Sequence, residues 1–417
     1  MATFQDSGLL DRLQPDAAQF LERAVRAAAP HGYPLHLVGG IVRDLILGRK
    51  NLDLDLVVEG DAIAVARSVF EELGGRLVTH QQFGTATIYV DHIILDVAMA
   101  RTESYPRPGA LPVVRPGAIG DDLHRRDFTI NAMALSLNAA TSGQVIDPLG
   151  GRHDLERGLV RVIHDRSFID DATRLLRAVR YEQRFGFALE PGTEALGSRD
   201  APMLSTISPD RVRYELERIL EESRPELALG RAQALGILSA VHPSLPWSND
   251  LSVRFAQARE ESVTSPLLYF GLWATTFLEE DLPGIANRLR LPLPWARVAR
   301  EAVRLMGRLD SLAAPGLAPS RLHGLLEGYS PEAVRACRLA TGSAIIRGRL
   351  DLFIDSLSKV KPLLNGRDLQ ALGVPVGPRV GRALEALKRA RLDGELATKE
   401  EEAAFVRRWQ AAAGPGG

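Results

Sequence analysis

Two aspartates separated by a single residue are the first candidates for chemistry in this sequence. Asp53 and Asp55 stand in the segment LDLDL, with leucines at the positions around them. Successive side chains of a β-strand point to opposite faces, so both carboxylates share one face and the leucines share the other. Paired carboxylate oxygens are ligands that Mg²⁺ prefers in proteins. The alternative for this pattern alone is a solvated edge strand.

A glycine pair precedes the aspartates. Gly39 and Gly40 follow the apolar residues 35–38, and helical spacing begins at Ile41. Backbone N–H groups at such a turn face outward at a helix N-terminus and favour an anion. Arg43, one turn into the helix, adds a fork of donors. An anion-binding turn followed closely by a carboxylate pair predicts nucleotidyl transfer with two Mg²⁺ ions.

The elements that must position these residues are predicted as a strand, a glycine turn, a short helix and a second strand. Further strands are expected at residues 76–78, 86–90 and 92–100, where apolar residues alternate or run together. In the last of them Asp96 alternates with apolar residues, and we expect it to be a third carboxylate beside the pair. Residues 101–120 are rich in proline and glycine and are predicted to form a loop. It is interpreted as a lid, a specificity element or a plain linker.

Two polar groups follow this loop. Arg126, Asp127 and Asn131 supply a cation, an acceptor and an amide suited to a ribose and a phosphate, although such a group alone is also typical of a solvated face. Asp171 and Arg174 lie three residues apart in a predicted helix. Together they can mimic the Watson–Crick edge of a base, and the alternative is a surface ion pair of little energetic value.

These segments resemble the tRNA nucleotidyltransferase/poly(A) polymerase family, in the superfamily that includes DNA polymerase β. The stretch LHLVGGIVRDLILGRKNLDLDLVV is similar to motif A of that family, and RRDFTINAMA is similar to motif B. The segment DDATRLLRAVRY is similar to motif D, with Asp170 in place of the usual Glu and Tyr181 in place of the usual Phe. The resemblance is strong from about residue 35 to residue 220.

The resemblance implies an α+β fold, with a polymerase β-like head on a mixed five-stranded sheet, followed by a helical neck, body and tail. It implies addition of CMP, AMP or both, from CTP and ATP, to the 3′ end of tRNA. The implied site residues are Asp53, Asp55 and Asp96 for catalysis; Asp53 and Asp55 for Mg²⁺; Gly39, Gly40 and Arg43 for the triphosphate; Arg126, Asp127 and Asn131 for the ribose; and Asp171, Arg174 and Arg177 for the base.

Four parts are expected along the chain: a head at residues 1–150, a neck at 151–220, a body at 221–350 and a tail at 351–417. In the tail, residues 378–391 hold five basic residues against one Glu. We interpret Arg379, Arg382 and Lys388 as contacts to the phosphate backbone of tRNA, because a glycine turn opens a basic helix there. A solvated helix is the alternative.

Composition narrows the remaining classes. The chain has 417 residues and a net charge of −1, so contacts to RNA require local clusters of basic residues. Its one cysteine, Cys337, excludes an internal disulfide and is interpreted as a small apolar residue. We see no signal peptide and no apolar run of membrane-spanning length. We therefore expect a cytoplasmic protein with no membrane contact, and nothing implies a protein partner.

Several alternatives stay open from the sequence. Within the family, the activity could be CCA, CC or A addition, or poly(A) synthesis, and the 101–120 loop favours the A-adding or CCA-adding forms. Outside it, the chain could be an RNA-binding module without catalysis, or a toxin-type enzyme that modifies proteins. Residues 147–163 are predicted to form a turn and a short hairpin. His153-Asp154 within them lacks the further ligands that a metal-dependent phosphohydrolase needs.

Overall fold

The structure is a computed structural model that describes residues 3–5, 8–261 and 264–413. The chain divides into two compact units, the first ending at Pro243 and the second beginning at Ser244. The finer division into head, neck, body and tail stays a prediction. Within the described residues, every helix is too short or too polar to span a lipid bilayer.

The first unit is built on a mixed sheet of eight strands in the order β1-β10-β9-β2-β3-β6-β5-β4. The strands are β1 (Thr3–Gln5), β2 (Leu35–Val38), β3 (Asp53–Val58), β4 (Arg76–His80), β5 (Thr85–Val90), β6 (Ile93–Met99), β9 (Ala134–Ser136) and β10 (Gln144–Ile146). Only β3 and β6 run parallel within this sheet. The α+β class is confirmed, but the expected number of five strands is wrong. The strands β1, β9 and β10 have three residues each, too few for an alternating pattern to be recognised.

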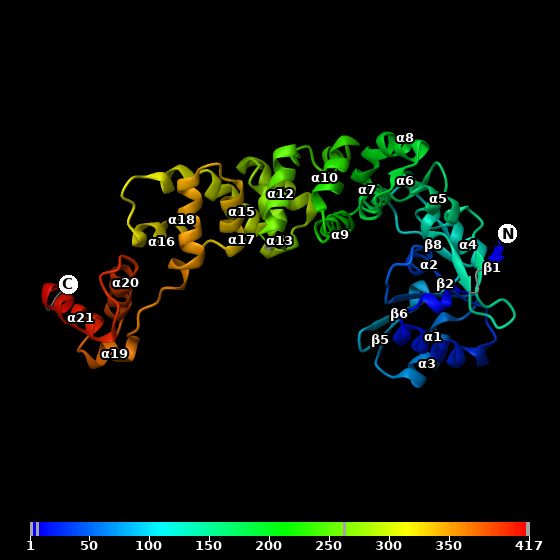
Figure 1. Cartoon of the computed structure of the whole chain (residues 1–417), viewed down its shortest axis with the longest axis horizontal. Coiled ribbons are helices and arrows are strands. Elements are labelled where there is room, and N and C mark those ends of the chain that lie inside the picture. Colours follow the sequence, from blue (N-terminus) through cyan, green and yellow to red (C-terminus); the bar gives the residue numbers. More distant parts are fainter. Residues whose placement is uncertain (1–2, 6–7, 262–263, 414–417) are drawn as a thin grey trace. The chain divides into compact units, whose positions relative to one another are not determined.

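Helices cover the sheet and fix its strands. The helices α1 (Pro15–Ala28) and α3 (Ala62–Leu73) pack against each other, and α3 lies against β5 and β6 (Figure 1). Asp61 caps α3 by accepting hydrogen bonds from two backbone N–H groups. A buried apolar cluster joins β2, β3, β9 and β10 to the short helix α4 (Ile119–His124). The face of the central strand β3 that carries Asp53 and Asp55 is therefore packed in the core further along the strand, at Val57.

The glycine turn between β2 and α2 (Gly40–Ile46) requires glycine for two reasons. Gly39 has a φ of 74°, a conformation that other residues rarely adopt. A Cβ atom on Gly39 would also lie only 2.6 Å from Nη1 of Arg126. The turn thus brings the backbone against a side chain from a distant part of the sequence. The expected order of strand, turn, helix and strand is confirmed.

The segment at 101–120, expected as a loop, contains a hairpin of β7 (Arg101–Ser104) and β8 (Val113–Pro116). The two strands pair with each other and not with the main sheet. Near the tip, Gly109 has a φ of 71°, and a Cβ atom there would lie 2.4 Å from Oγ1 of Thr206. The tip of the hairpin therefore contacts the segment that follows α8.

The rest of the first unit is mostly helical. Its elements are α5 (Gly151–Arg157), β11 (Leu159–Val160), α6 (Ser167–Asp170), α7 (Thr173–Phe185), β12 (Ala188–Leu189), α8 (Pro191–Asp200), α9 (Pro209–Leu220), α10 (Pro225–Ala234) and α11 (Ile237–Val241). The hairpin expected at 147–163 is wrong. Asp147 accepts hydrogen bonds from the backbone N–H groups of Gly151 and Arg152, so a helix begins there, and β11 pairs in parallel with β12.

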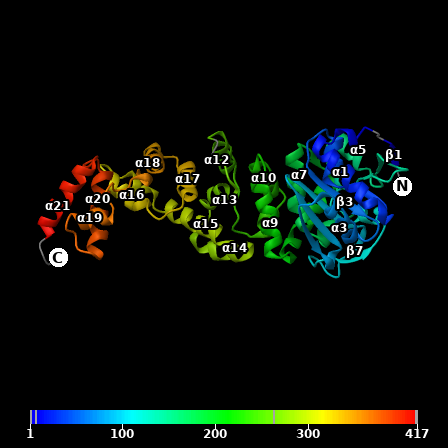
Figure 2. The same cartoon turned by 90° about the horizontal axis from the view of Figure 1, so that it is seen from below.

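The second unit is helical in the residues described (Figure 2). Its helices are α12 (Asn249–Glu260), α13 (Pro266–Ala274), α14 (Leu282–Leu289), α15 (Leu293–Met306), α16 (Pro319–Leu326), α17 (Pro331–Ala340), α18 (Ala344–Asp355), α19 (Gly366–Ala371), α20 (Pro378–Leu392) and α21 (Lys399–Ala413). Cys337 is fully buried, and burial raises the pKa of its thiol to about 12. The interpretation of this cysteine as an apolar core residue is consistent with that environment.

Candidate active site

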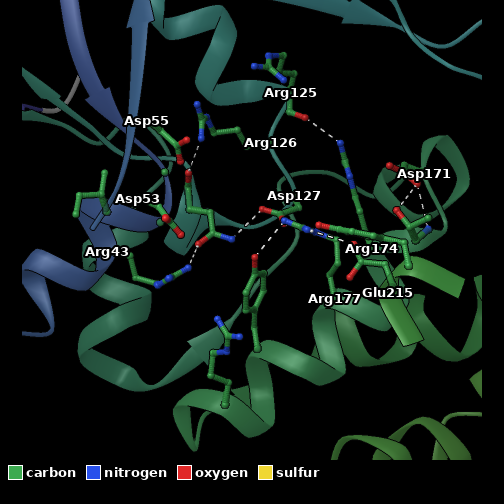
Figure 3. Close-up of a pocket in the computed structure, with 18 of the residues that line it drawn as sticks. Arg43, Asp53, Asp55, Arg125, Arg126, Asp127, Asp171, Arg174, Arg177 and Glu215 are labelled. Carbon is green, nitrogen blue, oxygen red and sulfur yellow. Dashed lines mark hydrogen bonds and ion pairs between the residues drawn. The ribbon is translucent and has the colours of Figure 1, made fainter. Parts of the chain in front are cut away.

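A cavity of about 930 Å³ in the first unit brings together residues from distant parts of the sequence (Figure 3). Its walls come from the turn before α2, β3, the segment between α4 and β9, and the helices α7 and α9. Most of the predicted residues line it: Gly39, Gly40, Arg43, Asp53, Asp55, Arg126, Asp127, Asn131, Asp171, Arg174 and Arg177. The structure thus places the motifs that resemble A, B and D around one space.

Asp53 and Asp55 lie at one side of this cavity, on β3. Asp96, on the adjacent parallel strand β6, is in register with Asp55, and its carboxylate accepts a hydrogen bond from the Thr87 hydroxyl at 2.5 Å. Burial raises the pKa of Asp55 to about 6. The charge of Arg126 lowers this pKa and the charges of Asp96 and Asp53 raise it. The negative charges of Asp53, Asp55 and Asp96 therefore repel one another.

A divalent cation suits this charge distribution, because it would stabilise the ionised form of Asp55, which burial and, to a smaller extent, the charges of Asp96 and Asp53 disfavour. Within the described residues, the structure holds no cluster of three or more His, Cys, Asp or Glu side chains arranged to bind a metal by themselves. Mg²⁺ is commonly bound by one or two carboxylates, with water and substrate phosphates completing its shell. Asp53 and Asp55 therefore fit a site that substrate completes. The role of Asp96 stays a prediction.

The guanidinium of Arg43 makes more interactions within the protein than the sequence indicates. Its guanidinium donates to Asp44 at 2.9 and 3.0 Å and to the side-chain oxygen of Asn131, and it lies 4.5 Å from the ring centre of Phe185. Only 5% of the residue is exposed. Arg43 thus contributes positive charge to the cavity wall and orients Asn131. Lys50, an exposed cation that sequence analysis did not single out, lines the same wall.

Asp127 is the centre of a buried network between the two sides of the cavity. It accepts hydrogen bonds from the Asn131 amide at 3.0 Å and from Arg177 at 2.6 and 2.9 Å. Burial opposes ionisation of Asp127, but the charge of Arg177 and the hydrogen bond from Asn131 hold its pKa at about 2. Arg177 also donates to the hydroxyl of Tyr181 at 3.1 Å. These residues form a fixed wall rather than a set of mobile side chains.

Asp171 and Arg174 both line the cavity but do not share one continuous helix. Asp171 lies between α6 and α7, where it accepts hydrogen bonds from the backbone N–H and the hydroxyl of Thr173. Its other oxygen accepts from Arg211 at 2.7 Å. Arg174 donates to the hydroxyl of Ser167 at 2.7 Å and to the carbonyl of Arg125 at 2.8 Å. The structure brings both groups to one space and gives each a different partner.

Asp122 lies behind the cavity wall and binds two arginines that line the cavity. Its fully buried carboxylate accepts from Arg125 at 2.7 Å and from Arg126 at 2.9 Å. Arg125 also donates to Glu103 of the hairpin at 2.9 Å, and Glu103 accepts from the hydroxyl of Tyr105 at 3.0 Å. Burial and the adjacent Glu103 raise the pKa of Tyr105, so its hydroxyl stays protonated. The hairpin is therefore part of the cavity wall.

The predicted tail contacts lie in the second unit, on α20. Lys388 forms an ion pair with Glu327 at 2.7 Å. Arg382 is exposed, and Arg379 is partly exposed near the start of the helix. Lys388 thus has a partner within the protein, and Arg382 is the more accessible of these cations.

Sequence analysis missed several residues that line the cavity: Lys50, Glu103, Tyr105, Arg125, Arg211, Tyr214 and Glu215. Glu103 and Tyr105 were not distinguished from the proline- and glycine-rich segment that follows them. Arg211 and Tyr214 lie three residues apart on α9, and that spacing is a signal for one helical face.

The fold and the site together define a nucleotidyltransferase, and comparisons with known proteins extend this to a family. Residues 35–161 match the poly A polymerase head domain, and residues 186–248 match the probable RNA and SrmB-binding site of polymerase A. The A-adding tRNA nucleotidyltransferase of Halalkalibacterium halodurans is 36% identical over 401 residues, which cover 95% of this chain and 93% of that protein.

Two further matches cover nearly the whole chain. The CC-adding tRNA nucleotidyltransferase of Deinococcus radiodurans is 34% identical over 98% of this chain and 97% of its own. The solved structure of the Thermotoga maritima CCA-adding enzyme complexed with tRNA-CCA has a TM-score of 0.77 at 30% identity, over 98% of this chain and 99% of that one. The chain belongs to the tRNA nucleotidyltransferase/poly(A) polymerase family, as its motifs indicate.

Proposed function

We propose that this protein adds CMP, AMP or both to the 3′ end of tRNA, without a nucleic-acid template. The oxygen of the RNA 3′-hydroxyl forms a bond to the α-phosphorus of CTP or ATP, and pyrophosphate leaves. The observation that carries this proposal is the single cavity that holds Asp53 and Asp55 on one wall and Asp171 and Arg174 on another. Such a cavity can hold a reacting phosphate and a base of the same nucleotide.

The carboxylates of Asp53 and Asp55, with Asp96 on the next strand, are proposed to hold two Mg²⁺ ions. When bound, these ions supply a lowered pKa for the attacking hydroxyl and charge stabilisation for the leaving pyrophosphate. The backbone at Gly39 and Gly40 and the charge of Arg43 are proposed to bind the triphosphate. The proximity of Arg126 to Asp55 supports a role in orienting that carboxylate and the phosphates beside it.

The rigid network around Asp127 is proposed to hold the ribose. Asn131 is fixed by Arg43 and by Asp127, so its amide presents one orientation to the cavity. Arg126 and Asp127 flank the same space, and Arg177 anchors Asp127 from α7. A wall that does not need to rearrange when substrate binds favours a defined sugar position.

Asp171 and Arg174 are proposed to read the base, with Arg177 supporting them. Cytosine and adenine both carry an exocyclic amine that a carboxylate can accept from, and both carry a ring nitrogen that a guanidinium can donate to. Uracil and guanine present a carbonyl at the corresponding position, which Asp171 would reject. One pair of side chains can therefore serve CTP and ATP and exclude UTP and GTP.

We favour A addition, alone or as the last step of CCA synthesis, over addition of CC alone, because the 101–120 segment resembles that of the A-adding and CCA-adding forms. Glu103, in the first strand of the hairpin, and Tyr105, directly after that strand, both line the cavity.

The four-part division of the chain is kept in this proposal, with Arg379, Arg382 and Lys388 of the tail contacting tRNA phosphates. A reducing compartment such as the cytoplasm suits a chain whose one cysteine is a buried thiol.

The test uses three forms of one tRNA transcript: lacking CCA, ending in CC, and ending in CCA. Each is incubated with the protein, Mg²⁺ and CTP, ATP or both, and the products are separated at single-nucleotide resolution. An A-adding enzyme extends only the CC form, with ATP; a CCA-adding enzyme also extends the form lacking CCA when both nucleotides are present. Extension of none of the three would refute the proposal, and continued growth with ATP would indicate a poly(A) polymerase.

A further inference from the structure

The helix α9 presents a basic–aromatic–basic stripe. Arg211, Tyr214 and Arg218 are spaced by three and four residues, which places them on one face of the helix. Arg211 and Tyr214 line the cavity. The guanidinium of Arg218 lies over the ring of Tyr214, 5.0 Å from its centre. Alternating cations and an aromatic ring on one surface are typical of sites that bind single-stranded RNA.

Tyr214 differs from the other tyrosines of the cavity. Tyr181 is 8% exposed and its hydroxyl accepts from Arg177, while the hydroxyl of Tyr105 donates to Glu103. Tyr214 is 52% exposed, and its hydroxyl has no hydrogen-bond partner among the residues that the structure describes. Core packing and hydrogen bonding therefore account for two of the rings and leave the third without such a role.

The position of Tyr214 relates it to the proposed base-reading group. Arg211, one turn earlier on α9, forms the ion pair with Asp171 at 2.7 Å. A helical turn advances about 5.4 Å, so Tyr214 lies about one turn along the wall from the residue that contacts Asp171. A base beside the incoming nucleotide would be within its reach. In templateless addition to RNA, that neighbour is the base at the 3′ end of the acceptor.

We propose that Tyr214 is a stacking platform for the unpaired base at the 3′ end of the acceptor RNA, with Arg211 and Arg218 flanking it. The ring binds any base by its π-face and places the terminal ribose for attack. This rests on the proposed function, because it assigns a subsite for the second substrate of that reaction. It adds a binding residue outside the sets proposed for metal, triphosphate, ribose and incoming base.

The test combines a change in the protein with a change in the RNA. Wild-type protein and Tyr214→Leu are compared on the transcript that the wild type extends, and on the same transcript with an abasic ribose at its 3′ end. Tyr214→Phe and Tyr214→Trp keep a stacking ring, and Tyr33→Leu is the control, since Tyr33 is an exposed tyrosine outside the cavity. Initial rates at varied RNA give kcat/KM, and KM for the nucleotide is measured separately.

We expect Tyr214→Leu to lower kcat/KM for the normal RNA roughly 5- to 150-fold, the range for loss of one base–aromatic stack. On the abasic RNA the two proteins should agree within about twofold, because neither can stack. Phe, Trp and the Tyr33 control should retain the wild-type values. Equal losses on both RNAs, or a rise only in KM for the nucleotide, would overturn the proposal. Failure of wild-type protein to extend any RNA would instead refute the proposed function.

Discussion

The carboxylate of Asp171 accepts a hydrogen bond from Arg211, 2.7 Å away, while Arg174 donates to Ser167 and to the carbonyl of Arg125. The two proposed base-reading groups are therefore held by separate partners, from α9 on one side and from the segment after α4 on the other. Each keeps its orientation without depending on the other. A base can then enter between groups that are already positioned.

Asp171→Ala should lower the use of CTP and ATP and relax the rejection of UTP and GTP. A buried mispair costs about 1–3 kcal/mol, which corresponds to roughly fivefold to 150-fold discrimination. Incorporation of all four nucleotides on a tRNA without its 3′ end measures this. Arg211→Ala is the matched variant, which frees one oxygen of Asp171 but keeps its carboxylate. A slower Asp171→Ala enzyme with wild-type selectivity would place base choice elsewhere, in the hairpin segment at 101–120.

Asp53→Ala and Asp55→Ala should each abolish nucleotide addition and leave tRNA affinity nearly unchanged. Each removes a proposed metal ligand at the cavity wall, and neither removes a proposed contact to RNA. Single-turnover extension and fluorescence anisotropy with labelled tRNA separate the two effects. Asp16→Ala, an exposed aspartate on α1, is the control. Turnover within about tenfold of wild type would contradict the assignment, since ligands of a catalytic metal contribute several kcal/mol.

Much of this site could be predicted because its motifs are local. The alternation of Asp53 and Asp55 with leucines, and the glycine turn before Ile41, are visible within a few residues of sequence. The pairs that complete the site are not local: Asp171 meets Arg211 across 40 positions, and Arg177 meets Asp127 across 50. No sequence period links such residues, so only the fold shows them. The hairpin was missed because its proline and glycine content favours a loop.

Asp127 gives a prediction for stability against pH. Its pKa is about 2 in the folded protein against an ordinary aspartate value of 3.8, so folding favours its ionised form. The resulting stabilisation is fully present above pH 4 and declines as pH falls toward 2. Asp127→Asn should therefore cost roughly 2–5 kcal/mol at pH 7, because it breaks a buried ion pair.

Urea unfolding of wild type and Asp127→Asn between pH 7 and pH 3 measures this difference. The gap between the two proteins should narrow as pH falls below 4. Asp16→Asn serves as the exposed control and should show little change at any pH. A constant gap across the series would mean that Asp127 stabilises the fold by packing and neutral hydrogen bonds alone.

Neutralising the tail cations should weaken tRNA binding and reduce its salt dependence. Each lost phosphate contact lowers the slope of log K against log salt by about 0.7 to 0.9. Because Lys388 is paired with Glu327 while Arg382 is exposed, Arg382→Gln should weaken binding more than Lys388→Gln, and the triple variant adds Arg379→Gln to both. Glu327→Gln should release Lys388 and strengthen binding. An unchanged slope in the triple variant with Lys388→Gln would show that α20 is a solvated helix.

The last prediction concerns where the catalytic half ends. A fragment of residues 1–220 would contain the whole cavity, but it would lack α10, which packs on α7 and contains the buried residues Ala228, Leu229 and Ala232. Arg231 of α10 forms ion pairs with Glu182 at 2.9 Å and with Glu194 at 2.9 Å. Glu182 is 5% exposed in the full chain, so truncating Arg231 alone would leave a buried charge, at a cost of about 3–5 kcal/mol.

We therefore expect residues 1–243 to unfold cooperatively as an isolated fragment, and residues 1–220 to be several kcal/mol less stable or not to fold. Because α7 carries Arg174 and Arg177, the loss would extend to the proposed base-reading residues. Urea unfolding of both fragments measures this, and Arg231→Ala in the full chain is the control that removes the ion pairs but keeps the helix. If residues 1–220 are as stable as 1–243, α10 belongs to the body, and the boundary predicted at 220 is the structural one.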